Sequence, residues 1–288
     1  MSALLLKLES ILAQWESEKT LLAPSSFSTR MEILDEIDRS LAESELINSN
    51  SGRDLAERTR AFSGKLNSLN EQFFTSIRQQ IKTGIFPSEF QAVLQQQSLM
   101  PPRGLAYDYL DDLVAGALQF EPPSEEPRPL GPDSVFFQPT PVRHIFHLIS
   151  AAAITSADTL IDLGAGLGHV PLLVSICTGA TCVGVEFDPA WVASAAKCAE
   201  ELNLRSVTFT TQDARETDLS TGTVFYLYTP FTGDTLSAVL ASLREQAARR
   251  SIRICTFGPC TLAVSNQFWL QPVTSPRADQ IAVFLPRE

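Results

Sequence analysis

The chain has 288 residues, of which 44% are hydrophobic and 19% are charged, a balance that favours one or two folded domains over extensive disorder. Its net charge of -11 comes without a basic run, so nucleic acid and anionic membrane surfaces are not expected as partners. No uncharged apolar run approaches the roughly 18–20 residues that span a bilayer. Five cysteines without metal-ligand spacing predict a cytoplasmic protein with reduced thiols and no metal site.

Residues 1–120 show the periodicity of amphipathic helices. The opening run MSALLLKLESILAQWESEK is interrupted by charges and predicts a helix rather than a signal peptide. The segment FSTRMEILDEIDRSLAESEL places Leu34, Ile37 and Leu41 on one face, with acidic residues opposite. NEQFFTSIRQQIKTG, FPSEFQAVLQQQ and YDYLDDLVAGAL are further helical segments. We therefore expect an all-α domain over 1–120.

The stretch EPPSEEPRPLGPDS, residues 121–134, contains five prolines and is predicted to be a linker between domains. Beyond it, in 135–288, short β-like runs alternate with helical ones. The β-like runs are 159–163, 181–186, 206–211, 223–229 and 251–257. This alternation predicts an α/β domain with a doubly wound, mostly parallel sheet. The last two β-like runs, QFWLQPV and QIAVFLPRE, leave no room for a helix between them and predict an antiparallel hairpin.

The run TLIDLGAGLGHVPLLV places a glycine-rich turn between a strand and a helix, the position at which α/β sheets receive nucleotide-like cofactors. Its pattern is G-x-G-x-G, from Gly164 to Gly168. The dinucleotide pattern G-x-G-x-x-G requires a third glycine where His169 stands, so a nicotinamide-dependent oxidoreductase is the less favoured alternative. The phosphate-loop pattern fails as well, because no Gly-Lys-Ser/Thr follows.

The sequence resembles the class I S-adenosylmethionine-dependent methyltransferases in four motifs that occur in order. LIDLGAGLG matches the first motif, CVGVEFD supplies the acid after the second strand, TFTTQDARE matches the third motif and VFYLYTPF lies at the fourth. The resemblance covers 135–288. It implies a seven-stranded Rossmann-like sheet, S-adenosyl-L-methionine as the cofactor, and methyl transfer to a small-molecule or protein acceptor.

The resemblance also implies roles for single residues. The glycines let the backbone approach the methionine part, Glu186 accepts from the ribose hydroxyls, and Asp213 with the amide of Ala214 binds adenine. Asp162 orients the glycine loop or meets the cofactor's ammonium. The segment FFQPTP resembles a turn that covers the methionine end in some bacterial methyltransferases. The residues expected at the cofactor are Gln138, Thr140, Asp162, Gly164, Ala165, Gly166, Glu186, Phe187, Asp213 and Ala214.

The fourth motif departs from the family pattern of enzymes that methylate amide or base nitrogens. Those enzymes carry Asn/Asp-Pro-Pro-Tyr/Phe, whereas this chain has Tyr-Thr-Pro-Phe from Tyr228 to Phe231. Tyr228 is our candidate catalytic residue and Phe231 a candidate wall of the acceptor pocket, with packing at a strand end as the alternative for both. Tyr107 and Tyr109 are further pocket candidates. The weakened fourth motif leaves open a protein that binds the cofactor without catalysis, as a regulatory or scaffold subunit.

Overall fold

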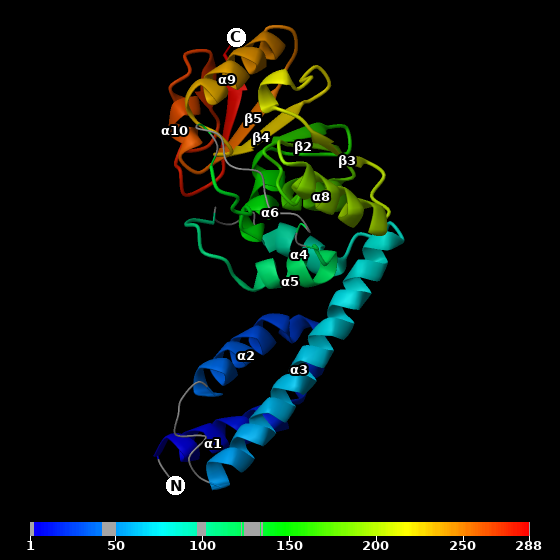
Figure 1. Cartoon of the computed structure of the whole chain (residues 1–288), viewed down its shortest axis with the longest axis vertical. Coiled ribbons are helices and arrows are strands. Elements are labelled where there is room, and N and C mark those ends of the chain that lie inside the picture. The colour runs from blue at the N-terminus through cyan, green and yellow to red at the C-terminus, as the bar shows by residue number, and fades with distance from the viewer. Residues whose placement is uncertain are drawn as a thin grey trace. The chain divides into compact units, whose positions relative to one another are not determined.

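The computed structural model describes residues 3–41, 50–96, 102–121, 123, 133 and 135–287 (Figure 1). The contacts within the chain divide it into two compact units, Met1–Ile77 and Arg78–Glu288. Within the described ranges, no helix combines the length and the apolar character needed to cross a membrane. The predicted boundaries at residues 120 and 134 stay predictions, because most of 121–134 lies outside the described residues.

The first unit is built from helices, as the sequence predicts. It contains α1 (Ala3–Ser17), the short 3-10 helices η1 (Lys19–Leu22) and η2 (Pro24–Ser26), α2 (Phe27–Leu41), and α3 (Asn50–Lys82) up to Ile77. The apolar faces meet in a core that includes Leu12, Ile37 and Leu66, each almost fully buried. Helix α3 begins well before the predicted helical segment, because Leu55, Phe62 and Leu66 recur at helical spacing and extend its buried face.

A buried arginine joins the helices of the first unit. The side chain of Arg30, on α2, is only 1% exposed. Its guanidinium donates to the carbonyl oxygens of Leu21 at 3.0 Å and Ala23 at 2.7 Å, and to Asn70 Oδ1 on α3 at 2.6 Å. A buried guanidinium is stable only where its donors are satisfied. These hydrogen bonds therefore tie the η1–η2 turns to α2 and α3.

Replacing Arg30 by Met removes these donors while keeping most of the apolar stem. We expect Arg30→Met to lower the free energy of unfolding of the first unit by at least about 2 kcal/mol, since hydrogen bonds to a charged group contribute more than neutral ones. Urea unfolding and amide exchange within 3–77 measure the loss. Arg39→Met, at a position where the side chain is 72% exposed, is the control and should cost less than about 0.5 kcal/mol. Equal stability of the two variants would contradict the role of Arg30.

The second unit contains the sheet and the remaining helices. Its strands are β1 (Thr159–Leu163), β2 (Thr181–Glu186), β3 (Val207–Thr211), β4 (Val224–Tyr228), β5 (Arg253–Phe257), β6 (Leu270–Pro272) and β7 (Ala282–Pro286). Its helices are α4 (Ser88–Gln96), α5 (Tyr109–Leu118), α6 (Val142–Ala151), α7 (His169–Thr178), α8 (Pro189–Glu201), η4 (Ala214–Glu216), α9 (Gly233–Ala247) and α10 (Cys260–Ser265). All five predicted parallel-sheet strands are confirmed. The short helix α10 was not predicted.

The seven strands form one sheet in the order β3-β2-β1-β4-β5-β7-β6. Strands β1 to β5 are parallel, and β1 pairs with β2 from Thr159 opposite Thr181 to Leu163 opposite Val185. Strand β7 is antiparallel to both β5 and β6, which confirms the predicted C-terminal hairpin. Helices α9 and α10 pack with β1, β4 and β5 in one core. Helices α6 and α8 lie on the other side of the sheet (Figure 1), so the predicted doubly wound α/β fold is confirmed.

The strand order reverses between β1 and β4, because the chain moves from β1 to β2 and β3 on one side and returns to β4 on the other. In such sheets the loops after the two central strands diverge and leave a crevice beyond the carboxyl ends. The glycine turn after β1 and the Tyr-Thr-Pro-Phe segment after β4 both begin at this crevice. The topology thus brings together two motifs that are more than sixty residues apart in the chain.

Candidate functional site

The glycine turn after β1 packs directly against the segment that follows β4. Gly164 has a φ of +95°, and a Cβ at this position would lie 2.2 Å from Cβ of Pro230. Gly166 also has a positive φ, +52°. The amides of Gly164 and Ala165 donate to the carbonyl oxygen of Val185 at 2.8 and 3.0 Å. Only glycine combines this backbone conformation with such a close approach. The packing therefore explains why the motif has a glycine at position 164.

Glu186, the last residue of β2, places its carboxylate beside the glycine turn. Its Oε2 accepts a hydrogen bond from the amide of Gly166 at 3.0 Å. Its Oε1 accepts from the amides of Phe187 at 2.8 Å and Asp188 at 3.1 Å. Three backbone donors thus orient one half-buried carboxylate. A carboxylate oxygen has more than one acceptor position, so a ligand's hydroxyl groups can still bind to it.

Asp162 lies on β1, two residues before the turn, and is only 4% exposed. Burial, together with the nearby charge of Glu186, raises the pKa of this carboxyl well above its usual range. A perturbed carboxyl inside a cavity is typical of functional sites. The ionised form of Asp162 is therefore unfavourable unless a cationic group lies beside it.

Asp213 follows β3 and caps the short helix η4. Its Oδ1 accepts from the backbone amide of Arg215 at 2.9 Å, and its carboxylate pairs with the guanidinium of the same residue at 2.6 Å. The hydrogen bonds from Arg215 lower the pKa of Asp213. Each carboxylate oxygen has more than one acceptor position, so Asp213 can accept from a further donor while this pair stays formed.

The segment 135–141 covers the glycine turn. The ring of Phe137 lies over Gly166, where an added Cβ would be 2.2 Å from Cε2, and it packs on Trp191 of α8 with ring centroids 4.3 Å apart. The hydroxyls of Thr140 and Tyr226 are 2.8 Å apart. These contacts bring the segment onto the sheet at the central strands.

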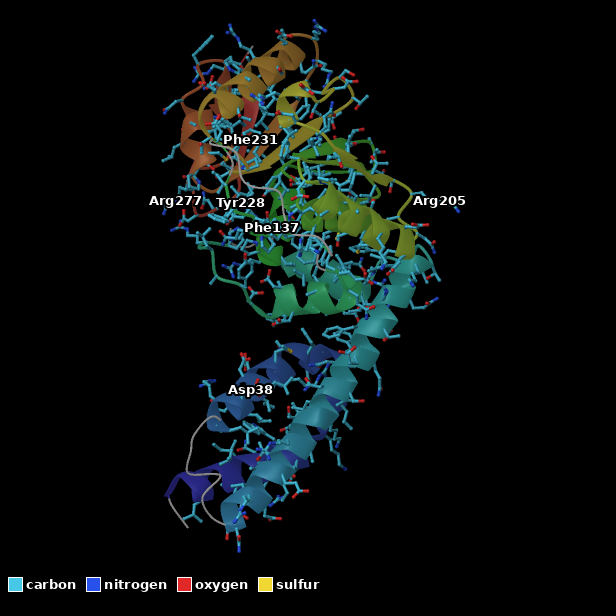
Figure 2. All side chains as sticks on the ribbon, in the orientation of Figure 1. Asp38, Phe137, Arg205, Tyr228, Phe231 and Arg277 are labelled. Atoms are coloured by element: carbon cyan, nitrogen blue, oxygen red, sulfur yellow. The ribbon has the colours of Figure 1, made fainter. Side chains whose placement is uncertain are left out.

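A cavity of about 1280 Å³ runs along this edge of the sheet. Most predicted site residues line it, namely Gln138, Thr140, Asp162, Gly164, Ala165, Gly166, Glu186, Phe187, Asp213, Ala214, Tyr228 and Phe231. Figure 2 shows Phe137, Tyr228 and Phe231 in one part of the second unit, in line with their shared cavity. Sequence reasoning missed Leu105, Phe136, Phe137 and Trp191. The two phenylalanines directly precede Gln138, which is the signal that could have found them.

Tyr107 and Tyr109, the other predicted pocket residues, are placed differently. Neither is among the residues that line the cavity. The hydroxyl of Tyr107 donates to the carbonyl oxygen of Pro139 at 2.9 Å, so it supports the segment that covers the glycine turn. Tyr109 is the first residue of α5 and is 40% exposed. A direct role for either in an acceptor pocket stays a prediction.

The histidines near the site are neutral at physiological pH. His144 is fully buried, bonds the carbonyl oxygen of Gly104 through Nε2 at 2.8 Å, and has its pKa lowered to about 4, chiefly by burial. His169 stacks on Phe120 with ring centroids 4.1 Å apart and lines the cavity. Burial lowers its pKa to about 4 as well. No group of three or more His, Cys, Asp or Glu among the described residues could hold a metal ion.

The Tyr-Thr-Pro-Phe segment is held in a strained conformation. Thr229 is a β-branched residue with a φ of +39°, a region that such residues rarely adopt. Its hydroxyl donates to the carbonyl oxygen of Phe257 at 3.2 Å and accepts from the amide of Cys260 at 3.0 Å. The neighbouring ring of Tyr228 packs on Phe257 at 4.7 Å, and burial raises the pKa of Tyr228 to about 12. At neutral pH this hydroxyl is therefore a hydrogen-bond donor.

The hydroxyl of Thr229 is expected to maintain this strained turn. Thr229→Val keeps the branched shape but removes both hydrogen bonds, which should lower the free energy of unfolding by about 1–3 kcal/mol. Thr229→Ser keeps the hydroxyl and should stay within about 0.5 kcal/mol of the natural protein. Urea unfolding curves of the full chain measure both changes. Equal stability of the Val and Ser variants would show that the hydroxyl does not hold the turn.

Comparisons with known proteins return methyltransferases among solved structures. No family model matches the chain, and no curated protein matches it. An RNA methyltransferase from Salinibacter ruber, in complex with S-adenosyl-L-homocysteine, is 26% identical, with 52% of this chain and 95% of that chain covered and a TM-score of 0.42. A precorrin-6y C5,15-methyltransferase from Geobacter metallireducens is 16% identical, with 49% and 84% covered and a TM-score of 0.36.

A third structure is an S-adenosylmethionine-dependent methyltransferase from Geobacter sulfurreducens, also in complex with S-adenosyl-L-homocysteine. It is 23% identical, with 39% of this chain covered and a TM-score of 0.33. The chain spans about half of that protein, 47% of its length. All three proteins are named as methyltransferases, and two of them were solved with S-adenosyl-L-homocysteine. Since these TM-scores lie below 0.5, the assignment of a cofactor depends on the residues of the site itself.

Proposed function

We propose that this protein transfers a methyl group from S-adenosyl-L-methionine to an acceptor. One observation carries the proposal: the glycine turn, Glu186 and Asp213, recognised as separate motifs, line a single cavity at the carboxyl ends of neighbouring parallel strands. Each of these groups has the chemistry that one part of the cofactor requires. Their order along the sheet, β1 then β2 then β3, is the order of methionine, ribose and adenine that the resemblance implies.

The residues fit the cofactor in four respects. The positive φ at Gly164 and the absence of a Cβ there let the backbone approach a ligand closely. The oriented carboxylate of Glu186 accepts hydrogen bonds from two neighbouring hydroxyls, as a ribose presents them. Asp213 accepts from the amino group of adenine while the amide of Ala214 donates to a ring nitrogen. Buried Asp162 is suited to a cationic group, because such a neighbour makes its ionised form favourable.

When bound, the cofactor supplies an electrophilic methyl group, to which the acceptor's lone pair bonds while the electron pair of the broken carbon–sulfur bond stays on sulfur. The protein's contribution is alignment, because holding two reactants in line removes much of the barrier. The glycine turn and Pro230 would hold the methionine part of the cofactor, and Tyr228 and Phe231 would contact the acceptor. A proton carried by the acceptor atom passes to water. The hydroxyl of Tyr228 keeps its own proton and orients the acceptor.

Cofactor binding tests the proposal directly. Calorimetric titration of the full chain should show binding of S-adenosyl-L-methionine and no binding of NADH. Glu186→Ala removes charge-assisted hydrogen bonds to ribose, each contributing roughly 1.5–3 kcal/mol, so affinity should fall at least about tenfold. Glu216→Ala, an exposed acid on η4, is the matched control and should bind as the natural protein does. Binding of NADH in place of S-adenosyl-L-methionine would refute the assignment and favour the oxidoreductase alternative.

Cofactor affinity should fall as the pH is lowered, because a proton on Asp162 competes with the cationic part of the cofactor. A carboxyl group ordinarily titrates near pH 4. Because the pKa of Asp162 is raised, the loss of cofactor affinity should occur at a higher pH than that. Asp162→Asn should weaken cofactor binding at high pH and make cofactor affinity less dependent on pH. Adenosine lacks the cationic groups, so its affinity should depend little on pH with either the natural protein or the variant. An unchanged pH profile in Asp162→Asn would contradict this coupling.

The same raised pKa has a consequence for stability. The native state binds this proton more tightly than the unfolded chain does, so the contribution of Asp162 to stability is fully present below the unfolded pKa and is lost as the pH rises through the native one. Asp162→Asn should remove this loss. The cofactor-free variant should therefore melt at a higher temperature than the natural protein at high pH, which scanning calorimetry measures.

Methyl release separates catalysis from mere binding. A protein that binds the cofactor as a regulatory or scaffold subunit would pass the titration and release no methyl group to any acceptor. The altered fourth motif is the reason to test for a binding protein without catalysis. Tyr228 stands where nitrogen methyltransferases carry Asn or Asp. Turnover over a library of small molecules and peptides is the deciding measurement.

A further inference from the structure

The cavity is larger than one cofactor requires. Its volume of about 1280 Å³ exceeds the roughly 300–1,000 Å³ of pockets that hold a single drug-sized ligand. Its lining also has two parts. The ends of β1, β2 and β3 supply the groups that fit the cofactor. The ends of β4 and β5, with Leu105, Phe136 and Ala278, line the rest, which we call the acceptor half. This division rests on the proposed function.

We propose that the acceptor is an uncharged, planar small molecule that enters the acceptor half beside the cofactor. The walls there are apolar and partly aromatic: Leu105, Phe136, Tyr228, Pro230 and Phe231 all line the cavity. Phe231 is buried, whereas Phe136 is 84% exposed. Aromatic side chains at such positions pack on flat, apolar ligands by offset or edge contacts. The exposed ring of Phe136 offers such a ligand a first contact with the cavity.

The charges that line the cavity oppose an anionic acceptor. Its described lining includes the acidic residues Asp133, Asp162, Glu186, Asp188, Asp213 and Asp279, against the single guanidinium of Arg215. That guanidinium is already paired with Asp213. A cavity lined by one sign of charge repels ligands of the same sign. A phosphate-bearing acceptor such as RNA is therefore disfavoured.

The carboxylates of the acceptor half already have partners within the protein. Asp133 accepts from the amide and hydroxyl of Thr235 at 3.1 and 3.0 Å. Asp279 pairs with the guanidinium of Arg277, labelled in Figure 2, at 2.9 Å. A lysine side chain would compete with these partners and would lose its hydration among the apolar walls of this half. An uncharged acceptor avoids both costs.

Tyr228 supplies the polar contact in this apolar half. Its ring is held against Phe257, its side chain lines the cavity, and its hydroxyl makes no hydrogen bond with the described residues. The strained turn at Thr229 fixes the direction in which the strand ends and therefore the position of the ring. A phenol-like hydroxyl that remains protonated donates one hydrogen bond. The acceptor therefore carries an oxygen or nitrogen that accepts it.

Three probes of the same shape and different charge test this proposal. The full chain, saturated with S-adenosyl-L-homocysteine, is titrated with 2-naphthol, 2-naphthalenesulfonate and 2-naphthylmethylammonium at neutral pH. We expect 2-naphthol to bind at least about tenfold more tightly than either charged probe. An RNA oligonucleotide and a lysine-rich peptide are titrated alongside. Tighter binding by any charged probe, by the RNA or by the peptide would overturn the proposal.

Two matched variants locate the binding site. Leu105→Trp adds bulk to a side chain that is 47% exposed and lines the acceptor half, whereas Leu262→Trp adds it to one that is 57% exposed and does not line the cavity. Leu105→Trp should weaken 2-naphthol binding at least about tenfold without changing cofactor affinity, and Leu262→Trp should change neither. Tyr228→Phe should also weaken 2-naphthol binding. If Leu105→Trp binds 2-naphthol normally, the acceptor half is not the binding site.

The readouts separate failure of this inference from failure of the proposed function. If S-adenosyl-L-homocysteine does not bind, the cofactor assignment is wrong and the acceptor half loses its definition. If S-adenosyl-L-homocysteine binds and the three probes show no preference for the neutral one, the methyltransferase proposal stands and only the acceptor class is overturned.

Discussion

The close contact between Gly164 and Pro230 determines the geometry of the whole site. It joins the turn after β1 to the turn after β4, the two loops that flank the point where strand order reverses. Any side chain at Gly164 would collide with the proline and force the loops apart. The amides of the same turn bond the carbonyl oxygen of Val185 and so fix the end of β2 as well. The contacts of this glycine turn therefore hold together the ends of β1, β2 and β4, beyond which the cavity lies.

The electrostatic character of the site follows from this packing. The turn lies above Asp162 and beside Glu186, so two carboxyl groups are confined at one edge of the sheet, one of them almost completely buried. In a cofactor-free protein such confinement is unfavourable for the charged form. Sites of this kind commonly reduce stability in return for binding a ligand of opposite charge. Strands β2 and β4, which pair with β1 on either side, supply the rigidity that tolerates it.

The acceptor half differs in chemistry from the rest of the cavity because different strand ends build it. Carboxylates dominate the ends of β1 to β3, whereas β4 and β5 end in aromatic residues, prolines and glycines. Nitrogen methyltransferases carry Asn or Asp where this chain has Tyr228, whose phenolic hydroxyl is a hydrogen-bond donor. The strained Thr229, held by two hydrogen bonds, keeps that donor at the cavity wall. The altered fourth motif is therefore part of an ordered structure.

Local patterns in the sequence were sufficient to predict the strands, the glycine turn, and the positions of Glu186 and Asp213 at the strand ends. The alternation of apolar residues and the spacing of one βαβ step each extend over about thirty residues or fewer. They can therefore be recognised in the sequence without knowledge of the fold. The tertiary structure alone decided that Phe137 packs on Trp191 over Gly166, that Leu105 lines the cavity, and that Tyr109 does not. Those relations join residues distant in the chain, and only the packing of the folded chain decides which of them meet.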